Sequence, residues 1–119
     1  MKKLIEWVEI PATDFQRAVH FYNAVFQIDL ETMDCGSEKM AFFPGGEGAI
    51  SLAPGFLPCR NGVLVSLGTG NHLDETIQRI IDLGGEITRS KTKIEAEGRG
   101  YFATFIDSEG NQLGLYGDK

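Results

Sequence analysis

The stretch Asp107-Ser108-Glu109-Gly110-Asn111-Gln112-Leu113-Gly114-Leu115-Tyr116-Gly117 decides how the rest of the chain is interpreted. Its first five residues form a polar turn, because glycine and asparagine tolerate positive φ and the Asp and Ser side chains can hydrogen-bond the turn backbone. An alternating run follows, with Leu113 and Leu115 on one face. This pattern predicts a strand that buries its two leucines against a core.

The other face of this predicted strand carries Gln112, Gly114 and Tyr116. A tyrosine is not typical of a fully solvated face, and a glycine in the middle of a strand leaves an empty place beside the backbone. One interpretation is that this face lines a cavity in which Gly114 makes room. The other is that Gly114 only lets a second backbone or side chain pack closely. The residues by themselves leave both open.

Length and composition indicate one compact domain over residues 1–119, since 42% hydrophobic and 24% charged residues are ordinary for a globular protein. The chain has no apolar run near the roughly 20 residues that span a bilayer. The basic start is followed by Glu6 and Glu9 rather than by an apolar stretch, so a signal peptide is not predicted. We therefore expect a cytoplasmic protein that does not enter membranes.

The net charge of −6 argues against nucleic acid or an anionic membrane as a partner, because phosphate binding needs clustered Lys and Arg. Arg89, Lys91 and Lys93 alternate in one segment and are typical of the solvent face or the guarded edge of a strand. Cys35 and Cys59 form no metal or redox motif and are interpreted as reduced structural thiols.

The same order of elements occurs twice along the chain. In the first half we predict strands at 4–10, 28–35, 40–43 and 48–53, with a helix that starts at Thr13 or Asp14 and ends near Phe26. In the second half we predict strands at 63–67, 86–94, 100–106 and 111–116, with a helix from about Asn71 that Gly84-Gly85 ends. The sequence therefore predicts an α+β fold of two βαβββ modules, 1–53 and 63–119, joined by a Pro- and Gly-rich linker at 54–62.

The predicted helices each cover one face of a four-stranded sheet, and the other faces are left free. Strand parity places six side chains on these free faces: Trp7, Glu9, Ser51, Gln112, Gly114 and Tyr116. Alternate residues among Phe42, Phe43, Tyr101, Phe102 and Phe105 join them, and we take Phe43 and Tyr101 as the cavity residues, which makes eight candidates. Aromatic residues with a few polar groups among them are typical of a small-molecule cavity. The alternative is a plain aromatic core between two half-sheets, against which Glu9 argues, because a carboxylate needs water or a partner.

Several motifs also carry a family resemblance: Ile10-Pro11-Ala12-Thr13-Asp14, Arg17-Ala18, Phe21-Tyr22, Val25-Phe26, Leu83-Gly84-Gly85 and the turn at 107–111. In this order and spacing they resemble the vicinal-oxygen-chelate superfamily, which contains glyoxalases, bleomycin resistance proteins and extradiol dioxygenases. The resemblance covers nearly the whole chain. It implies two βαβββ modules whose mostly antiparallel sheets curl into a half-barrel, and a homodimer that completes two cavities with either swapped or unswapped modules.

Enzymes of this superfamily hold a divalent metal in the cavity on three or four His or Glu ligands. The resemblance places the corresponding positions of this chain at Trp7, Ser51, 63–65 and Gly114, none of which is a His or Glu. A shift of register brings Glu6 or Glu9 near such a position but supplies no histidine, since His20 and His72 are expected on helices. We therefore predict no metal and no cofactor.

Three functional hypotheses follow. The first is a metal-free homodimer that binds a small, partly aromatic or amphipathic molecule, as the superfamily's resistance proteins that sequester antibiotics do. The second is a lyase or dioxygenase with a non-standard site, in which Glu9 acts as the base and Tyr116 donates a proton. The third is a regulatory or partner-binding domain, for which the acidic surface is the only feature.

Overall fold

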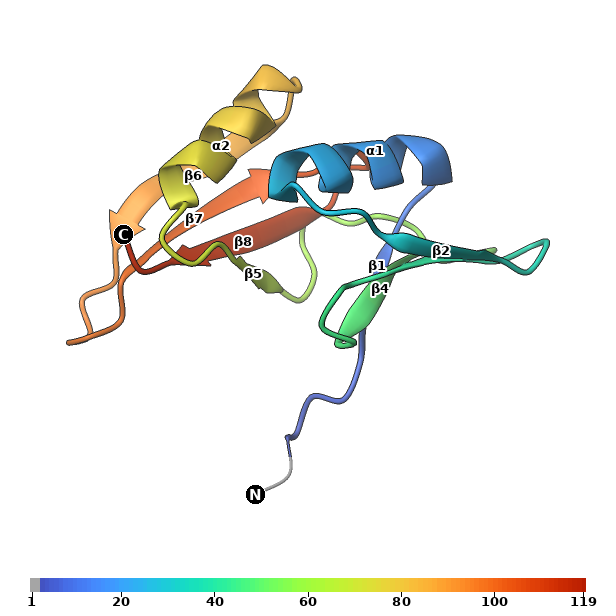
Figure 1. Cartoon of the computed structure of the whole chain (residues 1–119), viewed down its shortest axis with the longest axis horizontal. Helices are drawn as coiled ribbons and strands as arrows, with labels where there is room; N and C mark the ends of the chain where they lie inside the picture. The colour runs from blue at the N-terminus through green and yellow to red at the C-terminus, as the bar shows by residue number, and fades with distance from the viewer. Residues whose placement is uncertain (1–2) are drawn as a thin grey trace.

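The computed structural model describes residues 3–119. In chain order its elements are β1 (Val8–Pro11), α1 (Phe15–Phe26), β2 (Glu31–Asp34), β3 (Lys39–Phe42), β4 (Gly48–Leu52), β5 (Ser66–Gly68), α2 (Leu73–Asp82), β6 (Glu86–Lys93), β7 (Tyr101–Ile106) and β8 (Gln112–Gly117). The helices lie on one side of the strands, and the other side is open in this view (Figure 1).

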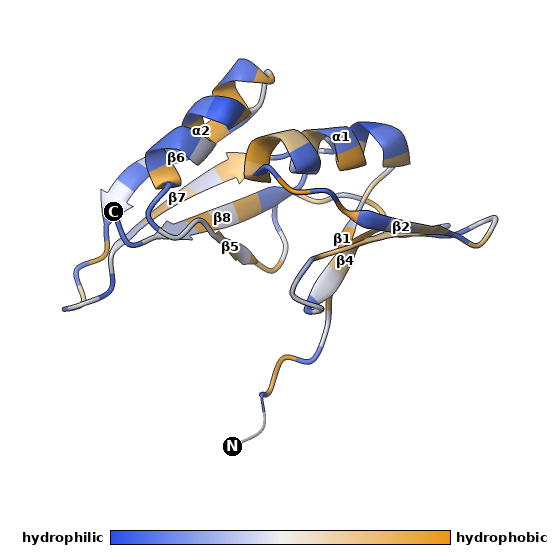
Figure 2. Ribbon diagram, in the orientation of Figure 1, coloured by the Kyte–Doolittle hydropathy of each residue, from blue (hydrophilic) through white to orange (hydrophobic). Residues whose placement is uncertain are grey.

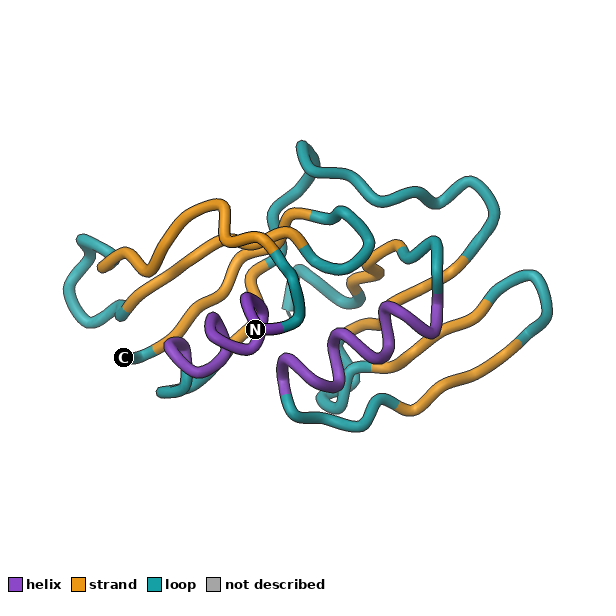
Figure 3. The backbone as a smooth tube through the Cα atoms, turned by 90° about the horizontal axis from the view of Figure 1, so that it is seen from above, coloured by secondary structure: helices purple, strands orange, loops and turns teal. Residues whose placement is uncertain are grey.

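The strands form two four-stranded sheets in the orders β1-β4-β3-β2 and β5-β8-β7-β6. In each sheet one pair is parallel, β1 with β4 and β5 with β8, and the other pairs are antiparallel. This confirms the predicted α+β fold of two βαβββ units with mostly antiparallel sheets. Seen from above, α1 and α2 lie next to each other over the two sheets, and they are in contact (Figure 3).

Helix α1 begins with a side-chain cap. The carboxylate of Asp14 accepts a hydrogen bond from the backbone N–H of Arg17 at 3.1 Å, so Asp14 rather than Thr13 is the cap. The helix ends at Phe26, and its C-cap Gln27 has a φ of 54°, in the left-handed region. The buried face of α1 includes Phe21, whose ring stacks on that of Phe105 in the second module with the ring centroids 6.4 Å apart.

Helix α2 lacks the side-chain N-cap hydrogen bond that α1 has. Its N-cap is His72, not Asn71, and this cap makes no side-chain hydrogen bond to the helix. The predicted end is correct, because Gly84 has a φ of 81° and the N–H of Gly85 bonds the carbonyl of Ile80 at 2.8 Å. The two helices carry apolar and polar residues on different sides (Figure 2).

Three edge strands begin later than predicted: β1, β2 and β5. Residues 4–7 precede β1, because β4 starts only at Gly48, the partner of Val8, and offers no earlier backbone to pair with. In the same way β5 begins at Ser66 rather than at 63, since its pairing with β8 starts at Gly114. The start of the chain, residues 1–2, lies outside the described residues.

The turn at 107–111 joins the two modules. The buried carboxylate of Asp107 accepts hydrogen bonds from the backbone N–H groups of Glu109 and Asn111, and Gly110 has a φ of 101°, as the predicted turn requires. Asp107 also accepts a 2.6 Å hydrogen bond from the hydroxyl of Tyr22 in α1. Asn111 donates to the carbonyl of Pro11 at the end of β1. The turn therefore fixes where the first module lies on the second.

Candidate functional site

The free face of the first sheet is defined by the strand register. Residues paired across neighbouring strands point to the same side, so Glu9, Ala49 and Phe42 share one face. The adjacent positions Ile10 and Ile50 are buried on the opposite face, which α1 covers. Glu9 and Phe42 therefore lie on the side of the sheet opposite α1.

A polar pair flanked by aromatic rings occupies this free face. The hydroxyl of Ser51 donates a 2.7 Å hydrogen bond to the carboxylate of Glu9. Ser51 is only 2% exposed, whereas Glu9 is open to solvent. The rings of Trp7 and Phe42 lie 6.3 Å apart at 58°. Glu9 therefore has both solvent and the Ser51 hydroxyl as hydrogen-bonding partners on this face.

The free face of the second sheet carries Gln112, Gly114 and Tyr116, as the alternation predicts. Leu113 and Leu115, the residues between them, are buried on the opposite face. A Cβ at Gly114 would come within 3.3 Å of the Ser66 Cβ and still closer to its hydroxyl. The space beside Gly114 is therefore filled by Ser66 of the neighbouring strand. This supports the interpretation that Gly114 lets another side chain pack closely. The hydroxyl of Tyr116 donates to the carbonyl of Arg99.

Two aromatic residues assigned to the free faces lie elsewhere. Tyr101 is not on the face of Tyr116, because the residue paired with Tyr116 is Phe102. The Tyr101 ring instead packs against the core and lies 4.6 Å from the ammonium group of Lys91. Phe43 comes after the end of β3, and its predecessor Phe42 is on the face. Ala103 and Phe105 are buried, and side chains alternate between the two faces of a strand. Counting from these two residues would have placed Phe102 on the free face.

One chain does not gather the eight candidate residues into one cavity. Glu9 and Gln112 line a hollow of about 330 Å³ between β1, the linker and the start of β8. Phe43 lines a second cavity of about 530 Å³ between the modules. The other candidates line neither of these two: Trp7, Ser51, Tyr101, Gly114 and Tyr116. Glu9 and Tyr116, the pair of the enzyme hypothesis, lie on different sheets.

The residues present do not fit a resident metal. In residues 3–119 no group of three or more His, Cys, Asp and Glu side chains is placed to hold an ion. His20 lies in α1, and His72 caps α2 with its ring 3.0 Å from the Glu75 carboxylate. Glu9 is a single carboxylate with a serine beside it, which is too few donors for a catalytic metal site. We therefore derive no metal-dependent step for this chain.

Comparison with known proteins agrees with this fold. Residues 4–115 match the glyoxalase/bleomycin resistance protein/dioxygenase superfamily, and the chain belongs to that superfamily. No curated protein matches the chain. Among the residues that the structure describes, no helix is long and apolar enough to cross a membrane.

Solved structures of the superfamily show the same fold at low identity. A fosfomycin resistance protein, FosX, from Listeria monocytogenes has a TM-score of 0.72 at 20% identity, over 100% of this chain and 96% of that one. A glyoxalase/bleomycin resistance protein/dioxygenase domain from Frankia sp. has a TM-score of 0.72 at 15% identity, over 100% of this chain and 93% of that one. A glyoxalase I variant from Zea mays has a TM-score of 0.72 at 18% identity. The match covers 97% of this chain but only 45% of that protein.

Proposed function

We propose that this protein binds a small, partly aromatic molecule without a metal, and that two copies associate to complete the cavity. The observation that carries the proposal is the Glu9–Ser51 pair beside Trp7 and Phe42 on a sheet face without a helix. Aromatic rings supply apolar contact area, and a fixed carboxylate supplies one directional polar contact. No nucleic acid or membrane is part of the proposal, and the cytoplasm is its setting.

Association of two copies is supported by the amount of surface that one chain exposes. The accessible area is 7532 Å², whereas a folded monomer of this mass is expected to expose roughly 6,400 Å². The difference is comparable to the roughly 800 Å² that each partner buries in a standard interface. A radius of gyration of 14.3 Å, against about 13.5 Å expected for this length, agrees with an open shape.

The exposed apolar residues lie beside two free sheet edges. Leu4, Ile5 and Trp7 precede or adjoin β1, and Val63 and Leu64 precede β5. Both strands are at the edge of their sheets. Apolar side chains next to an unpaired strand edge favour pairing with another chain. We therefore place the contact between copies along β1 and β5.

Two measurements on the same protein test the proposal. Sedimentation velocity should give a dimer, and the variant Val63→Asp should shift the dimer toward monomer because it puts a charge into the contact. A small-molecule screen by thermal shift should raise the melting temperature for at least one amphipathic compound. Because Trp7 is the only tryptophan, its fluorescence reports directly on binding at this face.

The variant Glu9→Gln separates binding at this face from general stabilisation. It should weaken binding of the compound found, whereas Glu95→Gln, which removes the same charge from an exposed loop residue, should not. A monomer at all concentrations, together with a screen in which no compound moves the melting temperature, would contradict the proposal.

A further inference from the structure

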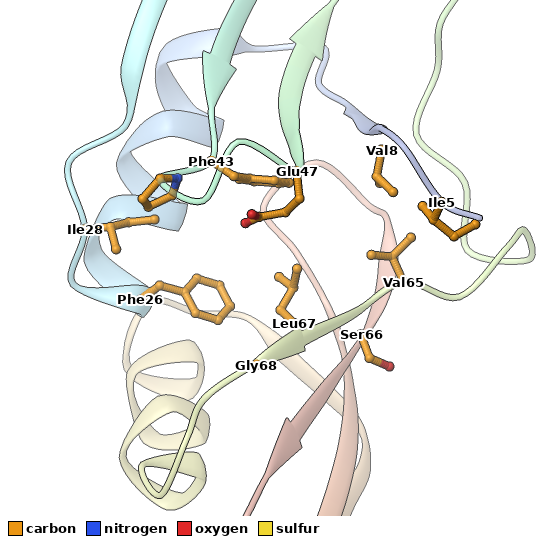
Figure 4. A pocket seen from close by; sticks show the side chains of 11 residues that line it. Ile5, Val8, Phe26, Ile28, Phe43, Glu47, Val65, Ser66, Leu67 and Gly68 are labelled. Atoms are coloured by element: carbon orange, nitrogen blue, oxygen red, sulfur yellow. The ribbon is translucent and has the colours of Figure 1, made fainter. Parts of the chain in front are cut away.

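A second cavity lies between the modules, below the carboxyl end of α1. It has a volume of about 530 Å³ and is bounded by the turn before β4 and by β5 (Figure 4). None of the residues Trp7, Glu9 and Ser51 lines it. It is therefore separate from the free sheet face proposed above. Its volume lies within the range of sites for small organic ligands.

The lining of this cavity is apolar except for one carboxylate. The apolar side chains that line it come from both modules: Ile5, Val8, Phe26, Ile28, Val65 and Leu67. The carboxylate of Glu47 points into the space between Phe43 and Leu67, whereas the hydroxyl of Ser66 points away from it (Figure 4). Glu47 is thus the polar group that a ligand in this cavity would meet.

Backbone hydrogen bonds fix the turn that carries Glu47. The N–H of Gly46 bonds the carbonyl of Phe43 at 3.1 Å, and the N–H of Val8 bonds the carbonyl of Glu47 itself at 3.1 Å. Gly45 has no Cβ, and a Cβ at that position would collide with the Glu47 carboxylate. The glycine therefore permits the carboxylate to fold back over its own turn toward the cavity.

Within residues 3–119, no Lys, Arg or His side chain lies within 4 Å of the Glu47 carboxylate. Glu47 is exposed to solvent, and its unpaired negative charge favours a cationic ligand over a neutral or anionic one in the adjoining cavity. The net charge of −6 further favours a cationic ligand over an anionic one.

We propose that this cavity binds a small organic cation, an amine or quaternary ammonium with an aromatic or alicyclic body. The body replaces water against Val8, Phe26 and Leu67, and the charged nitrogen pairs with Glu47. The ring of Phe43 lies beside the carboxylate and adds a cation–π surface (Figure 4). The site is separate from the free sheet face, but it borders the proposed contact between copies, because Ile5, Val8 and Leu67 lie in or beside β1 and β5.

The test uses three probes with one body: 2-phenylethylammonium, 2-phenylethanol and phenylacetate. Each is titrated into the full-length protein labelled with nitrogen-15, and binding is followed by amide chemical shifts. Binding of the cation should shift the amide signals of Gly46, Leu67 and Gly68. The cation should also bind about fivefold more tightly than the alcohol, which is the gain expected for an ion pair with Glu47 that is open to solvent on one side. Phenylacetate should bind most weakly.

Variants identify the group responsible. Glu47→Gln should remove the preference for the cation and leave the affinity for the alcohol unchanged. Glu38→Gln takes the same charge from an exposed residue of another turn and should change neither affinity. Equal affinities for the three probes in the unchanged protein would overturn the inference. So would cation binding that Glu9→Gln abolishes and Glu47→Gln does not, a result that would support the free sheet face instead.

Discussion

At the scale of single residues, Asp107 shows how one side chain holds a fold together. Its two carboxylate oxygens accept hydrogen bonds from the Glu109 and Asn111 backbone, from the Asn111 side chain and from the Tyr22 hydroxyl. Burial and the neighbouring Asp107 carboxylate raise the pKa of Tyr22 well above its usual value, so its hydroxyl stays protonated and donates. A buried carboxylate is tolerated here because its oxygens have these donors.

We predict that Tyr22→Phe lowers the free energy of unfolding by about 2 kcal/mol, because the buried Asp107 carboxylate loses one donor. Urea denaturation measures the change. Tyr116→Phe is the matched control: its hydroxyl bonds an exposed loop carbonyl, at Arg99. Its effect should stay below about 0.5 kcal/mol. Equal effects of the two substitutions would mean that the bond to Asp107 contributes nothing specific.

Gly114 shows that the sequence can indicate a close approach without identifying the neighbour. A glycine in mid-strand indicates that something approaches closely, and the sequence left a ligand and a neighbouring side chain as alternatives. The neighbour is Ser66, which the parallel pairing of β5 with β8 brings opposite Gly114. Residues 66 and 114 are far apart in sequence, so only the sheet register could identify the pair.

At the scale of elements, the approach of β1 to β4 depends on a glycine. A Cβ at Gly48 would lie 3.0 Å from the carbonyl carbon of Val8 and closer to its oxygen. These are backbone atoms that already pair with β4, so they cannot move without breaking the parallel pairing.

We predict that Gly48→Ala costs about 2 kcal/mol of stability, the range for forced overpacking. Gly62→Ala in the linker is the control, because its Cβ would meet only the Cys59 sulfur at 3.9 Å. Thermal unfolding of both variants measures the difference. A Gly48→Ala protein as stable as the Gly62→Ala protein would show that β1 can shift freely.

A second link between elements is the ion pair from Glu109 to the start of α1. Burial raises the pKa of Glu109, but hydrogen bonds from Arg17, from the Asp14 and Thr13 N–H groups and from Ser108 outweigh it and lower the pKa from 4.5 to about 2. The Arg17 Nε lies 2.8 Å from the carboxylate, whose side chain is 0% exposed. The ionised form is therefore favoured in the folded chain.

This shift predicts an acid dependence of stability. Because the folded pKa is below the unfolded one, ionised Glu109 stabilises the fold fully above pH 4.5, and this is lost as the pH falls toward 2. The loss should be about 2 kcal/mol, after allowance for the solvent around Arg17. Urea denaturation between pH 7 and pH 2 should show a flatter profile for Glu109→Gln. An unchanged profile in that variant would assign the acid dependence to other carboxylates.

At the scale of the whole molecule, the contacts between modules predict that the two sheets unfold together. Phe21 stacks on Phe105, Tyr22 bonds Asp107, and the Arg79 side chain of α2 donates to the carbonyl of Val25 at 2.6 Å. If the first module unfolded alone, Phe105, Asp107 and Arg79 of the second module would lose these partners. We therefore expect a single cooperative transition.

Two probes test this cooperativity. Trp7 fluorescence reports on the first module, and hydrogen exchange of the β7 and β8 amides reports on the second. The free energies from the two should agree, and Tyr22→Phe should lower both equally. A more weakly protected second module, or a change confined to one of the two probes, would show that the modules open separately.

The local sequence by itself determined the order of elements, the carboxyl ends of both helices and the turn at 107–111, because periodicity and glycines act over a few residues. It also indicated that Glu9 meets either water or a partner, and it placed both histidines outside the predicted strands. Only the tertiary structure decided that the partner was Ser51, that Phe102 rather than Tyr101 faces outward and that Glu47 points into a cavity between modules. These facts depend on strand register and on the packing of distant segments, which no local pattern encodes.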